Sequence, residues 1–142
     1  MIRDLLAIST RPGYRPGDER LVERHEVEEW VAKTKAKGIA SILCLLDEDQ
    51  LPLYRRALPE GLLAYYREVG FHVAHLPTHD GLSEPYTPEE YEQAWRYFCE
   101  LPKPVLVHCS AGHDRTGRVV RYILARLEEQ RGQGGDAESA AR

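Results

Sequence analysis

Short apolar runs alternate along this chain with segments in which apolar residues recur every three or four positions. The runs lie at residues 2–8, 39–46, 71–76 and 104–108, and each has a length typical of a β-strand. The run at 39–46 is almost continuously apolar, as expected of a strand that is covered on both faces. We expect 2–8 to form an edge strand and a polar loop to follow residue 46.

The segments between these runs carry the periodicity of amphipathic helices. Apolar stripes predict helices over 26–37, 62–69 and 116–130. A further helix is expected after Thr87, because Thr87-Pro88-Glu89-Glu90 is a capping box with proline at the first helical position. Strands that alternate with helices predict an α/β fold. We expect a single domain with a central, mainly parallel, twisted sheet of about four to five strands, helices on both faces, and a ligand site at the carboxyl ends of the strands.

Chain length and composition set the limits of this fold. The 142 residues suffice for one domain, which we assign to residues 1–130. Residues 131–142 are Gly, Ala and charged residues, and we expect them to form a disordered tail. The net charge of -4 does not suggest nucleic acid or an anionic membrane as partner. No apolar run approaches the ~20 residues of a membrane span, no export signal is recognisable, and three cysteines argue against a disulfide scaffold. We therefore expect a cytoplasmic monomer.

The segment between the last predicted strand and the last predicted helix concentrates groups that phosphate-ester chemistry requires. Residues 108–118 read HCSAGHDRTGR. A cysteine is nucleophilic as the thiolate, which positive charge and donated hydrogen bonds stabilise. A loop at a helix N-terminus offers converging backbone N–H groups and the positive end of the helix dipole. Cys109 is therefore the candidate nucleophile.

The residues after Cys109 are candidates for holding a phosphate group. Gly112 has no Cβ, so it lets the loop curl and approach the ligand closely. The planar guanidinium of Arg115 can grip two phosphate oxygens at once. The predicted phosphate-binding residues are Ser110, Ala111, Gly112, His113, Asp114 and Arg115.

These residues resemble the HCxxGxxR[ST] signature of cysteine-dependent protein tyrosine and dual-specificity phosphatases, which is matched in order by His108, Cys109, Gly112, Arg115 and Thr116. The resemblance implies a dual-specificity phosphatase-like fold and a phosphomonoester hydrolase. Cys109 would attack phosphorus, and water would then hydrolyse the phosphocysteine intermediate. The Thr116 hydroxyl would donate to the sulfur and ease its departure, and His108 would orient the loop. No nucleotide-binding motif is present, and we expect no cofactor.

The family also implies a general acid on a separate loop, worth roughly 10²–10⁴-fold in rate. Asp80 is the candidate, because it lies in the turn-rich segment 75–85 after the third apolar run and is followed by Gly81. Such a pair also occurs as a simple turn. The acidic loop Asp47-Glu48-Asp49 and, after it, Glu84 are the alternatives that we rank lower.

A metal site can be sought among the remaining histidines and cysteines. The candidates are His72, His75, His79, His108, Cys109 and His113. Alternation along a strand places His72 and His75 on opposite faces, and the paired spacing of a zinc site is missing, so we expect no metal. Cys44 is expected in the core. The alternative is a disulfide with Cys109 on oxidation, which requires the two Cα atoms to lie within roughly 7 Å.

Chain length also bears on the substrate. A pocket specific for phosphotyrosine needs extra loops, for which this chain has little material, so we expect activity on aryl phosphates and phosphotyrosine with some on phosphoserine or phosphothreonine. The partner would be a phosphorylated protein or a small phosphomonoester. Residues 112–117 also resemble the GxDRTG variant of some phosphoinositide phosphatases and bacterial lipid and protein phosphatases, in which Asp114 would brace loop amides or contact a polyol head group. A phosphoinositide or inositol-phosphate phosphatase is therefore one alternative, and a non-catalytic module that binds phosphorylated residues is another.

Overall fold

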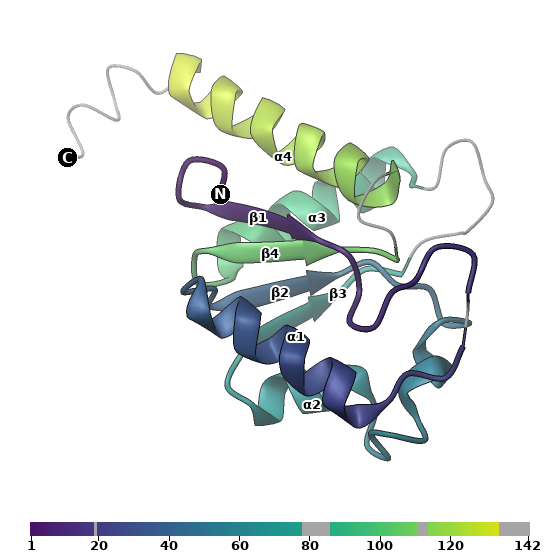
Figure 1. Ribbon diagram of the computed structural model, residues 1–142. Coiled ribbons are helices and arrows are strands. Elements are labelled where there is room, and N and C mark those ends of the chain that lie inside the picture. The colour runs from purple at the N-terminus through teal and green to yellow at the C-terminus, as the bar shows by residue number, and fades with distance from the viewer. Residues whose placement is uncertain (19, 78–85, 111–113, 134–142) are drawn as a thin grey trace.

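A parallel sheet forms the centre of the computed structural model, which describes residues 1–18, 20–77, 86–110 and 114–133 (Figure 1). Its strands are β1 (Leu6–Ser9), β2 (Ser41–Cys44), β3 (His72–His75) and β4 (Val105–His108). The order β1-β4-β2-β3 makes β1 and β3 the edges of this four-stranded sheet. The predicted α/β fold with a parallel sheet is confirmed, as is the edge position of the first strand.

The register brings the carboxyl ends of the strands together. Ser9 and Cys44 both pair with His108, and Cys44 pairs with His75 on its other side. Residues that follow parallel strands meet at the same edge of a sheet, where ligands bind in folds of this class. Cys109 comes directly after β4, which lies between β1 and β2. It is therefore near the middle of that edge.

Helices cover both faces of the sheet (Figure 1). They are α1 (Arg24–Ala36), α2 (Leu62–Glu68), α3 (Pro88–Glu100) and α4 (Asp114–Gln133). Alternation along β2 sends Leu43 into the layer with α3 and α4, and Ile42 and Cys44 into the layer with α1 and α2. This burial on two sides is why 39–46 is apolar throughout, since each fully buried Leu or Ile contributes about 1.5–3 kcal/mol.

The first strand is shorter than the predicted run at 2–8. A tight turn occupies its beginning, with the Ile2 N–H donating to the Leu6 carbonyl over 2.8 Å and the Leu6 N–H returning to the Ile2 carbonyl over 3.1 Å. Arg3 and Asp4 take positive φ values of 53° and 56° in this turn. Such values are uncommon outside glycine, so the sequence contains no signal for them.

The helix ends depart from the predicted ones where side chains cap them. Helix α1 begins two residues before Glu26, whose carboxylate accepts the Glu23 N–H over 3.0 Å. The capping box of α3 is confirmed: the Glu90 N–H donates to the Thr87 hydroxyl (3.2 Å), and the Thr87 N–H donates to the Glu90 carboxylate (2.9 Å).

Helix α4 begins at Asp114 and continues to Gln133, into the segment predicted as a tail, whose remaining residues lie outside the described ones. A short 3₁₀ helix, η1 (Leu51–Tyr54), occupies part of the predicted polar loop after β2. Within the described ranges, no helix combines the length and the apolar character that crossing a membrane requires.

Candidate active site

Cys109 lies where β4 passes into the loop that leads to α4. Its side chain is 2% exposed and packs in the layer with α3 and α4. Helix α4 follows after residues 110–113, so the positive end of its dipole lies at the end of this loop. Three of the predicted phosphate-binding residues, Ala111, Gly112 and His113, lie outside the described residues. So does the candidate acid Asp80.

The imidazole of His108 is fully buried and hydrogen-bonded at both nitrogens. Nδ1 lies 2.9 Å from the Cys109 carbonyl oxygen, and Nε2 lies 2.9 Å from the Tyr66 hydroxyl on α2. A carbonyl only accepts, so Nδ1 carries the proton and Nε2 accepts from Tyr66. Burial lowers the pKa of His108 to about 4, and Arg11 adds to the effect. At neutral pH His108 is therefore a neutral group that orients the Cys109 backbone.

The guanidinium of Arg115, in the first turn of α4, is held by the loop after β2. Its Nη1 donates to Oε1 of buried Gln50 over 3.2 Å. The Gln50 and Asp49 N–H groups donate to Oδ1 of Asp47 over 3.0 and 2.9 Å. Asp47 is buried, whereas Glu48 and Asp49 are exposed. The first residue of this acidic loop, one of the alternative proton donors, thus braces the backbone that presents Gln50.

Cys109 and Arg115 act electrostatically on the same neighbours. Burial raises the pKa of Cys44 to about 12; Arg115 opposes this rise and Cys109 adds to it. Burial likewise raises the pKa of Tyr86, again with Arg115 opposing and Cys109 adding. The sulfur and the guanidinium therefore lie within electrostatic range of the same two side chains. Cys44 and Cys109 are both free thiols, packed in layers on opposite faces of the sheet.

Two other predicted residues lie in the first turn of α4. The Thr116 hydroxyl is fully buried and has no hydrogen-bond partner among the described residues. An unpaired buried donor costs about 1–3 kcal/mol, and in a native structure it calls for an explanation such as a catalytic role. Asp114 is exposed, and its carboxylate pairs with Nε of Arg118 one turn further along the helix (3.0 Å). The Asp114 carboxylate therefore pairs along the exposed surface of α4.

Ser110, the residue after Cys109, is held by a segment near the N-terminus. The Arg11 backbone N–H donates to the Ser110 carbonyl over 2.9 Å, and the Arg11 Nε donates to the Ser110 hydroxyl over 3.0 Å. The Arg11 side chain is only 1% exposed. Two hydrogen bonds from Arg11 therefore join the loop after β1 to the loop after β4.

Leu76 and Tyr86, described residues on either side of the segment of the candidate acid, are joined by a hydrogen bond. The Tyr86 hydroxyl donates to the Leu76 carbonyl over 2.9 Å, and both residues are buried. This hydrogen bond joins the residues on either side of 78–85, which include Asp80. Since Tyr86 is within electrostatic range of Cys109, the two ends of the segment lie on the cysteine side of the sheet.

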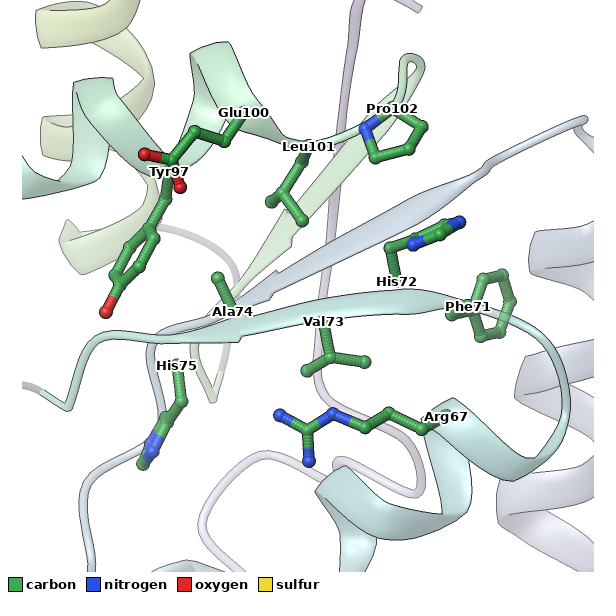
Figure 2. A pocket seen from close by; sticks show the side chains of 10 residues that line it. All are labelled: Arg67, Phe71, His72, Val73, Ala74, His75, Tyr97, Glu100, Leu101 and Pro102. Atoms are coloured by element: carbon green, nitrogen blue, oxygen red, sulfur yellow. The ribbon is translucent and has the colours of Figure 1, made fainter.

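A cavity of about 610 Å³ lies elsewhere, along the outer edge of β3, and its lining residues include none of the predicted site residues (Figure 2). Figure 2 shows His72 and His75 on opposite sides of the strand, as predicted. The His75 Nε2 lies 2.7 Å from the Leu46 carbonyl, to which it donates. Among the residues that the structure describes, no three His, Cys, Asp or Glu side chains form a candidate metal site.

Sequence reasoning missed the residues that hold the loop from outside it. They are Arg11, Gln50, Tyr66 and Tyr86. Their spacing relative to Cys109 follows no motif. A usable signal was position after a strand, because Arg11 follows β1 and Gln50 follows β2, and the carboxyl ends of parallel strands converge.

Comparisons with known proteins concern the second half of the chain most directly. Among solved structures, the chain is similar to the core catalytic domain of the PP-IP phosphatase SIW14 from S. cerevisiae, determined in complex with citrate. The identity is 18% and the TM-score 0.49, over 80% of this chain and 65% of that chain. No curated protein sequence gives a significant match. Residues 63–132 match the family model described as "Tyrosine phosphatase family", and this segment runs from α2 through Cys109 and Arg115 into α4. The similarity to the tyrosine phosphatase family thus covers residues 63–132, just under half of the chain.

Proposed function

We propose that the chain is a cysteine-dependent phosphomonoesterase that works through a phosphocysteine intermediate on Cys109. One observation carries the proposal. The strand-to-helix connection places a cysteine directly after the central strand β4 and a buried guanidinium, that of Arg115, in the first turn of α4. Both groups act on the same two neighbours, Cys44 and Tyr86, as expected if they share one pocket.

In the proposed first step, the Cys109 thiolate attacks phosphorus from the side opposite the ester oxygen. The S–P bond forms as the P–O ester bond breaks, and the departing oxygen takes a proton from Asp80. Arg115 and the backbone N–H groups of the loop hold the phosphoryl oxygens, whose charge they stabilise. The role of Asp80 is supported by its place between Leu76 and Tyr86, the hydrogen-bonded residues on either side of its segment.

In the second step, water attacks the phosphocysteine. Asp80, now a carboxylate, accepts a proton from this water, a P–O bond forms, and the S–P bond breaks to release inorganic phosphate and the thiolate. The Thr116 hydroxyl, a buried donor without a described partner, is suited to donate to the departing sulfur. The Nδ1–H of His108 donates to the Cys109 carbonyl and so holds the backbone beside the nucleophile.

The substrate class that we propose is protein phosphotyrosine, with lower activity on phosphoserine and phosphothreonine. A site for phosphotyrosine should also accept small aryl phosphates, and these serve as probes of its activity. The mechanism uses side chains and backbone N–H groups of this chain together with one water molecule. Arg115, whose guanidinium donates to Gln50, is the proposed phosphate clamp.

The first experiment measures turnover of an aryl phosphate by the purified chain, without added metal and with a chelator present. We expect turnover by the wild type, none by Cys109→Ser, and a strong loss for Arg115→Lys, because an ammonium cannot replace the bidentate fork. Rapid acid quench followed by mass measurement of the Cys109 peptide should detect an added phosphoryl group. Equal turnover by the wild type and Cys109→Ser would overturn the assignment.

A substrate panel then separates the remaining alternatives. It compares kcat/KM for phosphotyrosine, phosphoserine and phosphothreonine peptides, phosphoinositides and inositol phosphates. The proposal expects the highest value for a phosphotyrosine peptide. A higher value for a phosphoinositide or an inositol phosphate would assign the chain to that substrate class. Phosphopeptide binding without turnover of any compound would indicate a binding module.

A further inference from the structure

The side chain of Arg11 is a buried cation whose described partners are all neutral. It is 1% exposed. Its Nε donates to the Ser110 hydroxyl over 3.0 Å, and its Nη1 donates to the Tyr54 hydroxyl over 3.2 Å. The Tyr54 hydroxyl donates in turn to the Pro12 carbonyl over 2.6 Å. None of the ion pairs between described residues involves Arg11.

Neither an ionised tyrosine nor the nearby acid Glu26 supplies the missing negative charge. Burial raises the pKa of Tyr54 to about 12, although Arg11 acts in the opposite direction, so the phenol is neutral at physiological pH. On α1, the Glu26 carboxylate is paired with Arg20 over 2.7 Å and with Arg15 over 3.3 Å. Among the described groups, the charge of Arg11 is uncompensated.

Burying an ion without a counter-ion is expensive, and neutral hydrogen bonds recover only part of the cost. The rings of Tyr14 and Tyr54, whose centroids lie 5.7 and 6.0 Å from the Arg11 Cζ, recover a further part. A fold retains such a group where an anion compensates it. Arg11 therefore calls for an anionic species close by.

The position of Arg11 shows where this anion would lie. Its backbone N–H donates to the Ser110 carbonyl over 2.9 Å, so Arg11 holds both the backbone and the side chain of Ser110. Ser110 comes directly after Cys109. The field of Arg11 also reaches His108, whose pKa it lowers. The anionic species that the neighbouring loop would carry are the Cys109 thiolate and a bound phosphate group.

We propose that Arg11 is a positioning residue of the candidate active site, which fixes Ser110 in the phosphate-binding loop and lends its buried positive charge to the thiolate and the phosphate. The proposal rests on the proposed phosphatase function and deepens it. Two guanidinium groups would then serve one anion: Arg115 from the helix after the loop, and Arg11 from the loop after β1.

The other titratable groups around Cys109 leave this effect measurable. His108, the residue before it, has its pKa lowered to about 4 by burial and is neutral near pH 7. Burial raises the pKa of Cys44 on β2 to about 12 and also raises the pKa of Tyr86, which follows the acid segment, so both are neutral too. Arg11 and Arg115 both act on the neighbouring His108, and the proposal assigns the same two charges to the Cys109 thiolate, so removing Arg11 should shift the thiol equilibrium.

The test measures the rate at which iodoacetamide alkylates Cys109 as a function of pH, read from the mass of the Cys109 peptide. In Arg11→Met the pH midpoint of alkylation should rise by about one unit, the effect of one nearby charge in a partly screened site. Below the midpoint, kcat/KM for an aryl phosphate should fall by about tenfold. Arg11→Lys keeps the charge and loses the fork, so its midpoint should stay near that of the wild type while kcat falls.

Arg20→Met is the matched control, because Arg20 belongs to the same N-terminal region but pairs with Glu26 on α1. It should leave the alkylation midpoint unchanged, which separates the charge effect from loosening of the segment. Ser110→Ala removes the hydroxyl that Arg11 contacts and should lower kcat without moving the midpoint. This variant keeps the proposal testable if Arg11→Met does not fold. Thermal unfolding of each variant establishes that it is folded.

The outcomes distinguish this inference from the function on which it rests. An Arg11→Met midpoint equal to that of the wild type overturns the inference, as does an equal rise in Arg20→Met. If Arg11→Met does not fold, unchanged kcat in Ser110→Ala and Arg11→Lys overturns it. By contrast, a wild-type midpoint near the ordinary thiol value of about 8.5, together with absent turnover, would overturn the proposed phosphatase itself.

Discussion

His108 makes the stability of the fold depend on pH in a definable window. Its imidazole is fully buried, and its pKa falls from an ordinary 6.5 to about 4 because burial disfavours the charged form. Between these two values the unfolded chain binds a proton at this residue and the folded chain does not. Acidification in this range therefore favours the unfolded state, and stability rises again as pH increases towards neutral.

The size of the effect follows from the shift. One pKa unit corresponds to about 1.36 kcal/mol of difference between the two states. With folded and unfolded values of about 4 and 6.5, the free energy of unfolding should fall by about 2.5 kcal/mol between pH 7 and pH 4.5. Carboxylates with lowered pKa values, such as Glu26 beside Arg20, begin to contribute below that range.

The assay is urea denaturation of the wild type and His108→Asn at half-unit steps from pH 7 to 4.5, followed by circular dichroism. Asparagine keeps an N–H donor but does not titrate in this range, so the pH slope of His108→Asn should lack the contribution of about 2.5 kcal/mol. His25→Asn, at an exposed position on α1, is the control and should keep the wild-type slope. The reasoning is refuted if the curves of the wild type and His108→Asn run parallel to within about 0.5 kcal/mol.

Other substitutions test single contacts of the site and the fold. Gln50→Leu removes the acceptor for the Arg115 guanidinium, and kcat/KM for an aryl phosphate should fall by about tenfold, the equivalent of roughly 1.4 kcal/mol. Asp80→Asn should slow turnover of alkyl phosphates by roughly 10²–10⁴-fold, and of aryl phosphates with good leaving groups much less, because an alkoxide needs the proton; a series of leaving groups measures this. Thr87→Ala removes the cap of α3 and should lower the free energy of unfolding in urea by about 1 kcal/mol.

Each of these substitutions has a counterpart that changes a neighbour or keeps the group. Glu48→Gln alters an exposed residue in the loop of Gln50, and a loss of kcat/KM as large as that of Gln50→Leu would contradict the role given to the Arg115 contact. A larger loss of turnover in Glu84→Gln than in Asp80→Asn would show that Glu84, and not Asp80, is the general acid. Thr87→Ser keeps the capping hydroxyl, so a destabilisation equal to that of Thr87→Ala would exclude capping as the cause.

The order of strands and helices was predictable because it depends on local periodicity. The run at 39–46 needed no knowledge of partners to be identified as a strand buried on both faces, and the capping box at Thr87 is a local signature. The ends of elements depend on more specific contacts. The turn that shortens β1 uses positive φ at Arg3 and Asp4, and the start of α1 depends on the Glu26 carboxylate. Neither feature has a distinct pattern in the sequence.

The candidate site divides in the same way. Cys109 and Arg115 belong to one connection between a strand and a helix, so their spacing alone has a chemical meaning. Arg11 and Gln50 reach the same region from positions 99 and 65 residues before their partners Ser110 and Arg115. Such contacts exist only once the strand order β1-β4-β2-β3 places the loops after β1 and β2 on either side of Cys109. Beyond the edge position of the first strand, the sequence predicted nothing of that order.

The strand order also explains why holding residues and reacting residues come from different parts of the chain. A loop that presents backbone N–H groups to an anion leaves its own carbonyls and side chains in need of partners. Ser110 is held by Arg11 in the loop after β1, and the Cys109 carbonyl accepts from His108. The Arg115 guanidinium donates to Gln50 in the loop after β2. Because β4 lies between β1 and β2, its neighbours are the loops closest to it. The proposed chemistry thus depends on one short segment, and the geometry of that segment depends on the whole sheet.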